Sequence, residues 1–163
     1  MPRKLASLLL ILAISGCTPN ADVEPTSCHN DQPGSMEIGG GDMATGYKAL
    51  KDGDNALVTL GPQGLHMILV SVKLKNFEAP QVGSGTSELW LSVYHGDKLL
   101  GATPVTEKPV QLGDTTVVFL GLRPTITADD AKAYFGDLST VEVSIRDGCD
   151  RVVQAKRVVR LIQ

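Results

Sequence analysis

The stretch that most constrains the fold runs from His66 to Lys75, with the sequence HMILVSVKLK. Within it Ile68, Val70, Val72 and Leu74 alternate with residues that become polar toward the end of the stretch. A period of two places these four side chains on one face of a β-strand, and β-branched residues favour strands. We therefore expect a strand whose one face is buried in a hydrophobic core.

Similar short apolar runs, separated by turns rich in glycine, recur along the chain. Strands are expected over residues 36–38, 47–50, 56–60, 88–94, 98–103, 115–122, 141–145 and 151–162. One helix is expected at 127–135, where Thr127 is the N-cap and Gly136 is the stop. This pattern predicts an all-β domain over 36–163, an immunoglobulin-like β-sandwich of about 7–9 strands with one short helix.

The match to a true immunoglobulin domain is only partial. Cys28, Trp90 and Cys149 occur in the order typical of that family. The two cysteines, however, lie much farther apart in sequence than the cysteines that join the two sheets of an immunoglobulin domain.

The N-terminus has the layout of a secretory signal. Arg3 and Lys4 precede an apolar run over residues 5–13, and small residues follow up to Cys17. A membrane-spanning helix needs roughly 20 apolar residues, so the run is too short to be one. The order of charge, apolar segment and small residues predicts a signal peptide over residues 1–16.

The four residues Ile14-Ser15-Gly16-Cys17 resemble the lipobox of bacterial lipoproteins, an aliphatic residue and two small ones before a cysteine. The resemblance implies cleavage before Cys17 and acylation of its thiol. Two or more acyl chains, at about 0.8 kcal/mol per buried methylene, hold a protein firmly at a membrane. In that family a non-acidic residue after the cysteine, here Thr18, favours the outer membrane. The alternative is an ordinary signal peptide that ends near a cysteine by chance.

Residues 17–35 are predicted to be a tether that follows the lipidated cysteine. They are poor in apolar residues and contain prolines, which is typical of a linker. Because an oxidising compartment favours bridging, Cys28 and Cys149 are predicted to form a disulfide between the tether and a late turn. Two unrelated free thiols are the alternative.

A second resemblance concerns the segment Gly61-Pro62-Gln63-Gly64-Leu65-His66, which runs into the long strand. It is similar to a motif of small, uncharacterised, secreted or lipid-anchored β-sandwich proteins of bacteria, although a second glycine usually stands where Leu65 does. The resemblance implies a fold and a location but no activity.

Composition argues against several classes of function. The 163 residues include 15 basic and 18 acidic ones, a net charge of −3, and loss of Arg3 and Lys4 with the signal makes the mature chain more acidic. A mildly acidic chain with scattered basic residues does not predict nucleic-acid binding.

The sequence also lacks a recognisable catalytic motif. Gly83-Ser84-Gly85 lacks the strand before it and the helix after it that a nucleophile elbow requires. We therefore predict no catalytic residues, no cofactor and no enzymatic activity, and expect a binding or structural module.

Trp90 and Tyr94 are the candidate partner-binding residues. They have the opposite parity from Leu89, Leu91 and Val93 in the predicted strand. If the side chains at these alternate positions face solvent, the two aromatic rings form a platform for a glycan or for an envelope protein. The alternative is that a loop or the helix covers them.

A competing hypothesis from another class is a copper-handling or enzymatic domain centred on His66. Imidazole and thioether ligands suit copper, and Met67 is adjacent. No His-x-His pattern or methionine repeat supports a metal site, so no metal ligands are assigned. The simpler interpretation is a histidine whose ring hydrogen-bonds the loop over residues 61–64.

Four basic residues gather late in the chain, at Arg151, Lys156, Arg157 and Arg160. Charged side chains on an edge strand prevent sheet-to-sheet pairing, which is the favoured interpretation. Contact with anionic lipid headgroups is the alternative, because the anchor would already hold the domain near the membrane.

Overall fold

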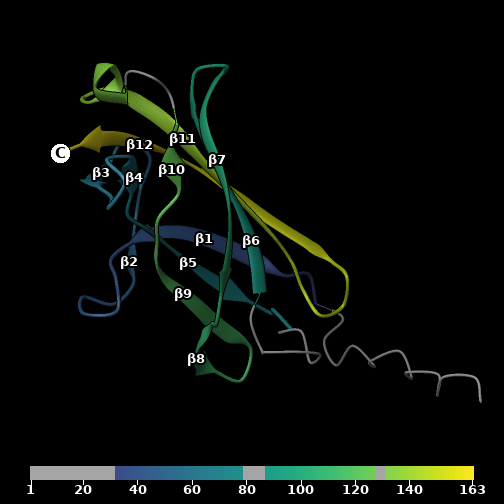
Figure 1. Ribbon diagram of the computed structural model, residues 1–163. Coiled ribbons are helices and arrows are strands. Elements are labelled where there is room, and N and C mark those ends of the chain that lie inside the picture. The colour runs from purple at the N-terminus through teal and green to yellow at the C-terminus, as the bar shows by residue number, and fades with distance from the viewer. Residues whose placement is uncertain (1–31, 79–86, 128–130) are drawn as a thin grey trace, which may run out of the picture.

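The computed structural model describes residues 32–78, 87–127 and 131–163, which form two β-sheets in separate layers (Figure 1). The smaller sheet has the order β2-β1-β5-β9-β8. Its strands are β1 Ser35–Gly40, β2 Lys48–Ala49, β5 Val70–Lys75, β8 Val110–Gly113 and β9 Thr116–Leu122. All of its neighbouring strands are antiparallel.

The larger sheet has the order β10-β4-β3-β12-β11-β6-β7. Its strands are β3 Asn55–Leu60, β4 His66–Ile68, β6 Ser87–His95, β7 Lys98–Glu107, β10 Thr125–Ile126, β11 Leu138–Arg146 and β12 Val152–Ile162. Its pairs are antiparallel except that β12 runs parallel to β3. The prediction of an all-β domain is therefore confirmed.

The core lies between the sheets and uses the alternation seen in the sequence. Ile68, Val70, Val72 and Leu74 are fully buried, as predicted. From the larger sheet, β6 and β11 add their inward residues Leu89, Leu91, Val93, Val141, Val143 and Ile145. Each of these side chains contributes roughly 1.5–3 kcal/mol by leaving water, before the loss of chain entropy.

The strand predicted over residues 66–75 is interrupted at Leu69. Before it β4 belongs to the larger sheet, and after it β5 belongs to the smaller one. At the interruption the Leu69 amide donates to the Leu57 carbonyl, and the Ile68 amide donates to the Pro124 carbonyl. The chain thus turns a corner between the layers while Ile68 and Val70 both stay in the core.

The predicted helix over residues 127–135 is wrong in type and extent. The described residues contain a single short 3₁₀ turn, η1, from Ala131 to Tyr134, while residues 128–130 lie outside the described part. The amide and the hydroxyl of Thr127 both donate to the Leu100 carbonyl, and the residues that it would cap lie outside the described part. Gly136, with a φ of +93°, follows the turn as the predicted stop, and its amide donates to the Leu161 carbonyl.

The described residues form twelve strands rather than about 7–9. The excess comes from the split at Leu69 and from the short strands β8 and β10, whereas β2 lies within the strand predicted at 47–50. β8 and β10, with four and two residues, have too few positions to show alternation and therefore leave no signal in the sequence.

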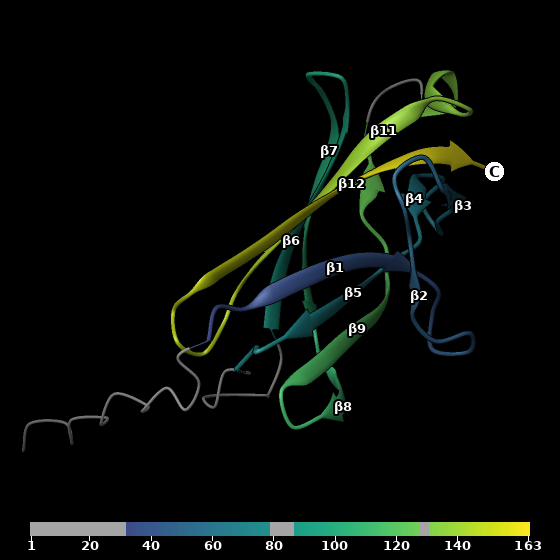
Figure 2. The same cartoon turned by 180° about the vertical axis from the view of Figure 1, so that it is seen from behind.

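The strands β11 and β12 form a long hairpin that crosses one side of the molecule (Figure 2). β12 lies between β3 and β11 and is therefore a central strand. Because β12 pairs with β3 only at residues 160–162, the interpretation of the basic residues as guards of an edge strand is wrong for Arg160 and stays a prediction for Arg151, Lys156 and Arg157. The C-terminus lies close to η1, at the end of the molecule opposite the β11–β12 turn (Figure 1).

Candidate binding face around Trp90

Trp90 lies on the outer face of β6, with 53% of its surface exposed. Leu89, Leu91 and Val93 point into the core, so the predicted parity is confirmed. Tyr94 lies on the same outer face and is half-buried. The described residues therefore leave Trp90 uncovered, which agrees with the platform interpretation at this position.

The strand register places polar residues beside Trp90 in one row across the sheet. Trp90 is paired with Pro104 on β7 and with Ser144 on β11. Ser144 is in turn paired with Gln154 on β12. Four strands thus align one aromatic ring with a hydroxyl and an amide.

The next row toward Tyr94 contains a charge pair. Ser92 is opposite Glu142, and Glu142 is opposite Lys156. The Lys156 Nζ lies 2.5 Å from the Glu142 Oε1. The hydrogen bond from Lys156 to Glu142, and then their mutual attraction, raise the pKa of Lys156, so the row keeps a paired positive and negative charge at neutral pH.

Two shallow hollows flank Trp90 on this face. One has a volume of about 290 Å³ and is lined by Trp90, Ser92, Glu142, Ser144, Gln154 and Lys156. The other has a volume of about 410 Å³ and is lined by Glu88, Trp90, Ser144, Arg146, Asp147 and Val152. Trp90 and Ser144 are common to both, so the indole separates two adjoining depressions. Sequence parity identified Trp90 but missed the residues on β11 and β12, because their register against β6 leaves no signal in the sequence.

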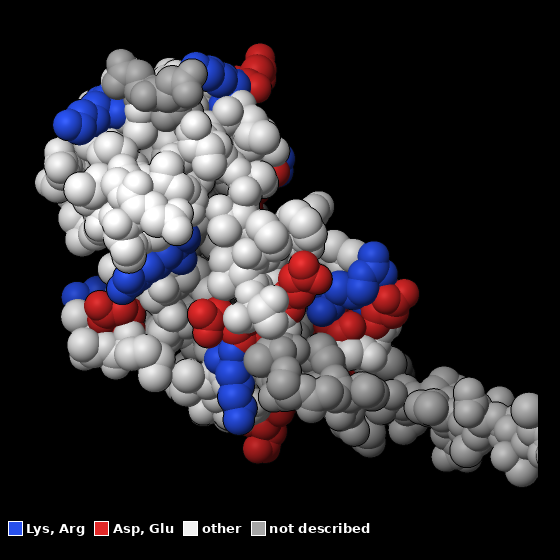
Figure 3. All heavy atoms as spheres, viewed as in Figure 1, with Lys and Arg blue, Asp and Glu red and all other residues white. Residues whose placement is uncertain are grey.

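Acidic and basic side chains are interspersed on the face shown in Figure 3. Lys and Arg lie next to Asp and Glu there, and much of the remaining surface carries no charge (Figure 3). This face therefore carries no extended basic patch of the kind that a phosphate backbone needs.

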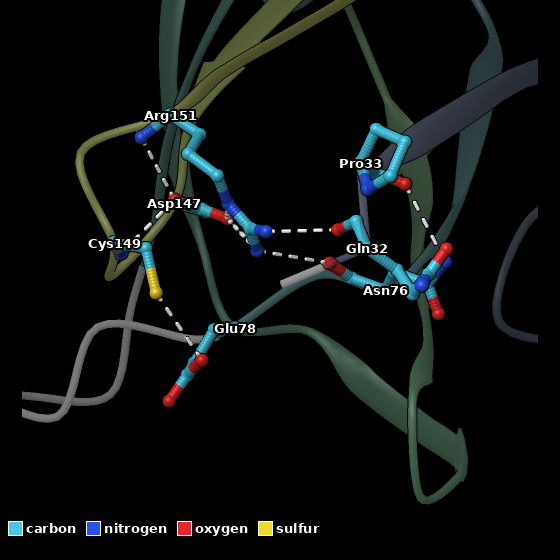
Figure 4. Close-up of polar contacts among 7 residues, drawn as sticks. All are labelled: Gln32, Pro33, Asn76, Glu78, Asp147, Cys149 and Arg151. Carbon is cyan, nitrogen blue, oxygen red and sulfur yellow. Dashed lines mark hydrogen bonds and ion pairs between the residues drawn. The ribbon is translucent and has the colours of Figure 1, made fainter. Parts of the chain in front are cut away.

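A buried ion pair organises the turn between β11 and β12 (Figure 4). The Asp147 side chain is fully buried, and its Oδ2 lies 2.7 Å from the Arg151 Nη2. Its Oδ1 accepts hydrogen bonds from the amides of Cys149 and Arg151. The Arg151 guanidinium also donates to the carbonyls of Gln32 and Asn76. One arginine therefore links the turn to the start of the described chain and to the end of β5.

The predicted lipid and disulfide residues are only partly described. Cys17 and Cys28 lie outside the described residues, so both assignments stay predictions. Cys149 is half-buried in the β11–β12 turn, where its Sγ lies 3.2 Å from the Glu78 Oε2 (Figure 4).

His66 lies at the start of β4, and its ring packs edge-on against Phe135, with 5.3 Å between the ring centroids. Among the described residues its side chain makes no hydrogen bond, so the expected bond to the loop over 61–64 is not present. Within the same residues no group of three His, Cys, Asp or Glu side chains is placed to hold a metal ion. The copper hypothesis stays a prediction.

The late basic residues have individual partners. Arg157 Nη1 lies 3.2 Å from Asp52 Oδ1, and Arg160 donates to the Gly136 carbonyl. Arg151 and Lys156 pair with Asp147 and Glu142, as described above. The four residues thus hold neighbouring elements together, and contact with lipid headgroups stays a prediction.

Comparison with known proteins gives no relatives: no family model, no curated protein and no solved structure matches the chain. In the part of the chain that the structure describes, no helix has the length and apolar character needed to cross a bilayer. Function must therefore be inferred from the chain's own residues.

Proposed function

We propose that this protein is a lipid-anchored lipoprotein of the bacterial cell envelope, held at the outer membrane, that acts as a non-catalytic binding module. The signal peptide and the lipobox-like residues before Cys17 support the anchor and the location. The observation that carries the binding role is the half-exposed Trp90 between two hollows. A tryptophan buries a large area on contact with a partner, and leaving it in water has a cost that binding removes.

We propose further that the domain is a variant of the immunoglobulin-like sandwich. Its support is the pair of mostly antiparallel sheets around one core, and the last strand β12 that runs parallel to the early strand β3. The corner at Leu69, where the chain passes from one sheet to the other, departs from the usual arrangement. An experimental structure with a match to that fold would test this assignment.

The predicted disulfide has geometric support. Arg151 donates to the carbonyl of Gln32 at 2.9 Å, and Cys149 lies two residues before Arg151. Cys28 precedes Gln32 by four residues, which extend over at most about 14 Å. We propose that Cys28 and Cys149 are bridged, so that the tether leaves the domain beside the β11–β12 turn.

The binding role is tested with purified protein in the Cys17→Ser background, which lacks the proposed lipid, and with isolated envelopes of the source bacterium, from which the native protein has been deleted. In this background the protein with Trp90 intact is expected to sediment with the envelopes, and Trp90→Ala is expected to remain largely in the supernatant. Leu112→Ala is the matched control, because Leu112 is 60% exposed but lies on β8 of the other sheet. Equal sedimentation of wild type and Trp90→Ala would contradict the proposal.

A further inference from the structure

We infer that the ligand of the Trp90 face is an uncharged polysaccharide chain. The inference rests on the proposed function, that this face binds a partner, and adds the chemical class of that partner. Shape, hydrogen-bonding capacity and charge point to the same class.

The shape suits a chain that lies across the sheet. Trp90 stands between two open hollows that share Ser144, rather than at the bottom of one closed pocket. A chain that follows both hollows would pass over the indole. The apolar C–H face of a sugar ring stacks on an indole, and the ring edge remains free for polar contacts. Tyr94, four residues further along β6, adds a second ring about 13 Å away.

The polar residues around Trp90 are available to a ligand. Within the described ranges the side chains of Ser92, Ser144 and Gln154 make no hydrogen bond to other protein groups. Hydroxyl and amide groups both donate and accept hydrogen bonds. They match the hydroxyl groups of a sugar, which also do both.

Two pairs of opposite charges near Trp90 are neutralised within the face, and Glu88 adds one further carboxylate at the second hollow. Lys156 pairs with Glu142 at 2.5 Å, and Arg146 pairs with Asp150 at 2.7 Å. A charged polymer would have to break one of these pairs, or would face the like charge of its second member. The face is therefore complementary to a neutral ligand rather than to an acidic one.

A peptide is a poorer occupant of the same face. Peptides commonly bind to sheets by adding a strand at an edge, where backbone groups are unpaired. β6 is paired with β7 and β11, and β11 is paired with β6 and β12. Around Trp90 and Ser144, β6 and β11 therefore offer a peptide side chains only, whereas β12 is paired with β3 only at residues 160–162.

The inference is tested by titrating the mature protein with neutral oligosaccharides. Trp90 is the only tryptophan in the chain, so its fluorescence reports directly on this face. The probes are cellotetraose and the tetramer of N-acetylglucosamine, with oligogalacturonate as an acidic comparison. We expect at least one neutral probe to shift the Trp90 emission to shorter wavelength, with an affinity that changes little with salt.

Variants measured by calorimetry then locate the site. Trp90→Ala is expected to weaken binding of the neutral probe at least about tenfold, because stacking and buried area are lost together. The double variant Ser144→Ala, Gln154→Ala is expected to weaken it severalfold, and Leu112→Ala is expected to bind like wild type. Circular dichroism shows whether each variant is folded.

The outcomes separate this inference from the proposed function. If no neutral probe binds at millimolar concentration while sedimentation with envelopes still depends on Trp90, the polysaccharide inference is overturned and the binding role stands. Preference for oligogalacturonate would also overturn the inference. If no probe binds and sedimentation is independent of Trp90, both proposals fail.

Discussion

Two arginines beside the β11–β12 turn show how burial changes the contribution of an ion pair to the stability of the fold. Arg151 pairs with the fully buried Asp147, whereas Arg146 pairs with Asp150 on the surface. Arg151→Met should lower the free energy of unfolding by about 3–5 kcal/mol, because it leaves a buried carboxylate without its partner. Arg146→Met should change it by no more than about 1 kcal/mol. Urea denaturation of both variants checks this, and equal effects would contradict the buried position of Asp147.

Phe119 is the largest fully buried side chain of the core and packs edge-on against Phe77. Phe119→Ala should cost about 3–5 kcal/mol of stability, through lost burial and the cavity that remains. The exposed Leu112→Ala should stay within about 0.5 kcal/mol of wild type. Denaturation by urea again gives the values, and a loss below 1 kcal/mol for Phe119→Ala would contradict the placement of the core.

At the scale of elements, Gly101 on β7 controls how closely β10 approaches. A Cβ added at Gly101 would lie 2.0 Å from the Thr125 carbonyl oxygen, so the backbones would have to separate. Gly101→Ala should therefore destabilise the domain by at least about 1–3 kcal/mol. Gly113→Ala is the matched control, since an added Cβ there would meet nothing within 4 Å. Thermal unfolding of the two variants tests the contact, and equal midpoints would contradict it.

The alternation of apolar residues predicted which segments are strands, and it predicted which faces of β5, β6 and β11 are buried. It did not predict the sheet to which each strand belongs. The run through Leu69 is continuous in sequence, yet its two halves lie in different sheets, because a corner needs no break in apolar character when both sides stay buried. The predicted helix failed for a related reason: Thr127 bonds to Leu100, which is distant in sequence.

The candidate site was predictable only in part, because local sequence patterns do not contain contacts between distant strands. The alternation along β6 places Trp90 on the face opposite the core, and this is a local property of one strand. The position of Ser144 and Gln154 beside Trp90 depends on the register between three strands, which is a property of the folded sheet.

At the scale of the whole molecule, the bond between Arg151 and Gln32 places the start of the described chain at the β11–β12 turn. The proposed bridge from Cys28 to Cys149 would hold the tether at the same end. Such a long closed loop stabilises a domain by up to about 4–5 kcal/mol, so Cys149→Ser should lower the stability of the oxidised protein by several kcal/mol. Mobility on non-reducing gels and thiol counting after unfolding check the bridge, and two reactive thiols at residues 28 and 149 in native protein would contradict it.

The proposed residence of this protein in the cell envelope depends on the chemistry at Cys17. The most direct measurement is the mass of the N-terminal peptide of the protein purified from its native membranes. We expect a peptide that begins at Cys17 and carries the mass of its acyl chains, and a double variant Cys17→Ser, Trp90→Ala that no longer sediments with membranes. A native peptide that retains residues 1–16, or that begins with an unmodified Cys17, would contradict the account.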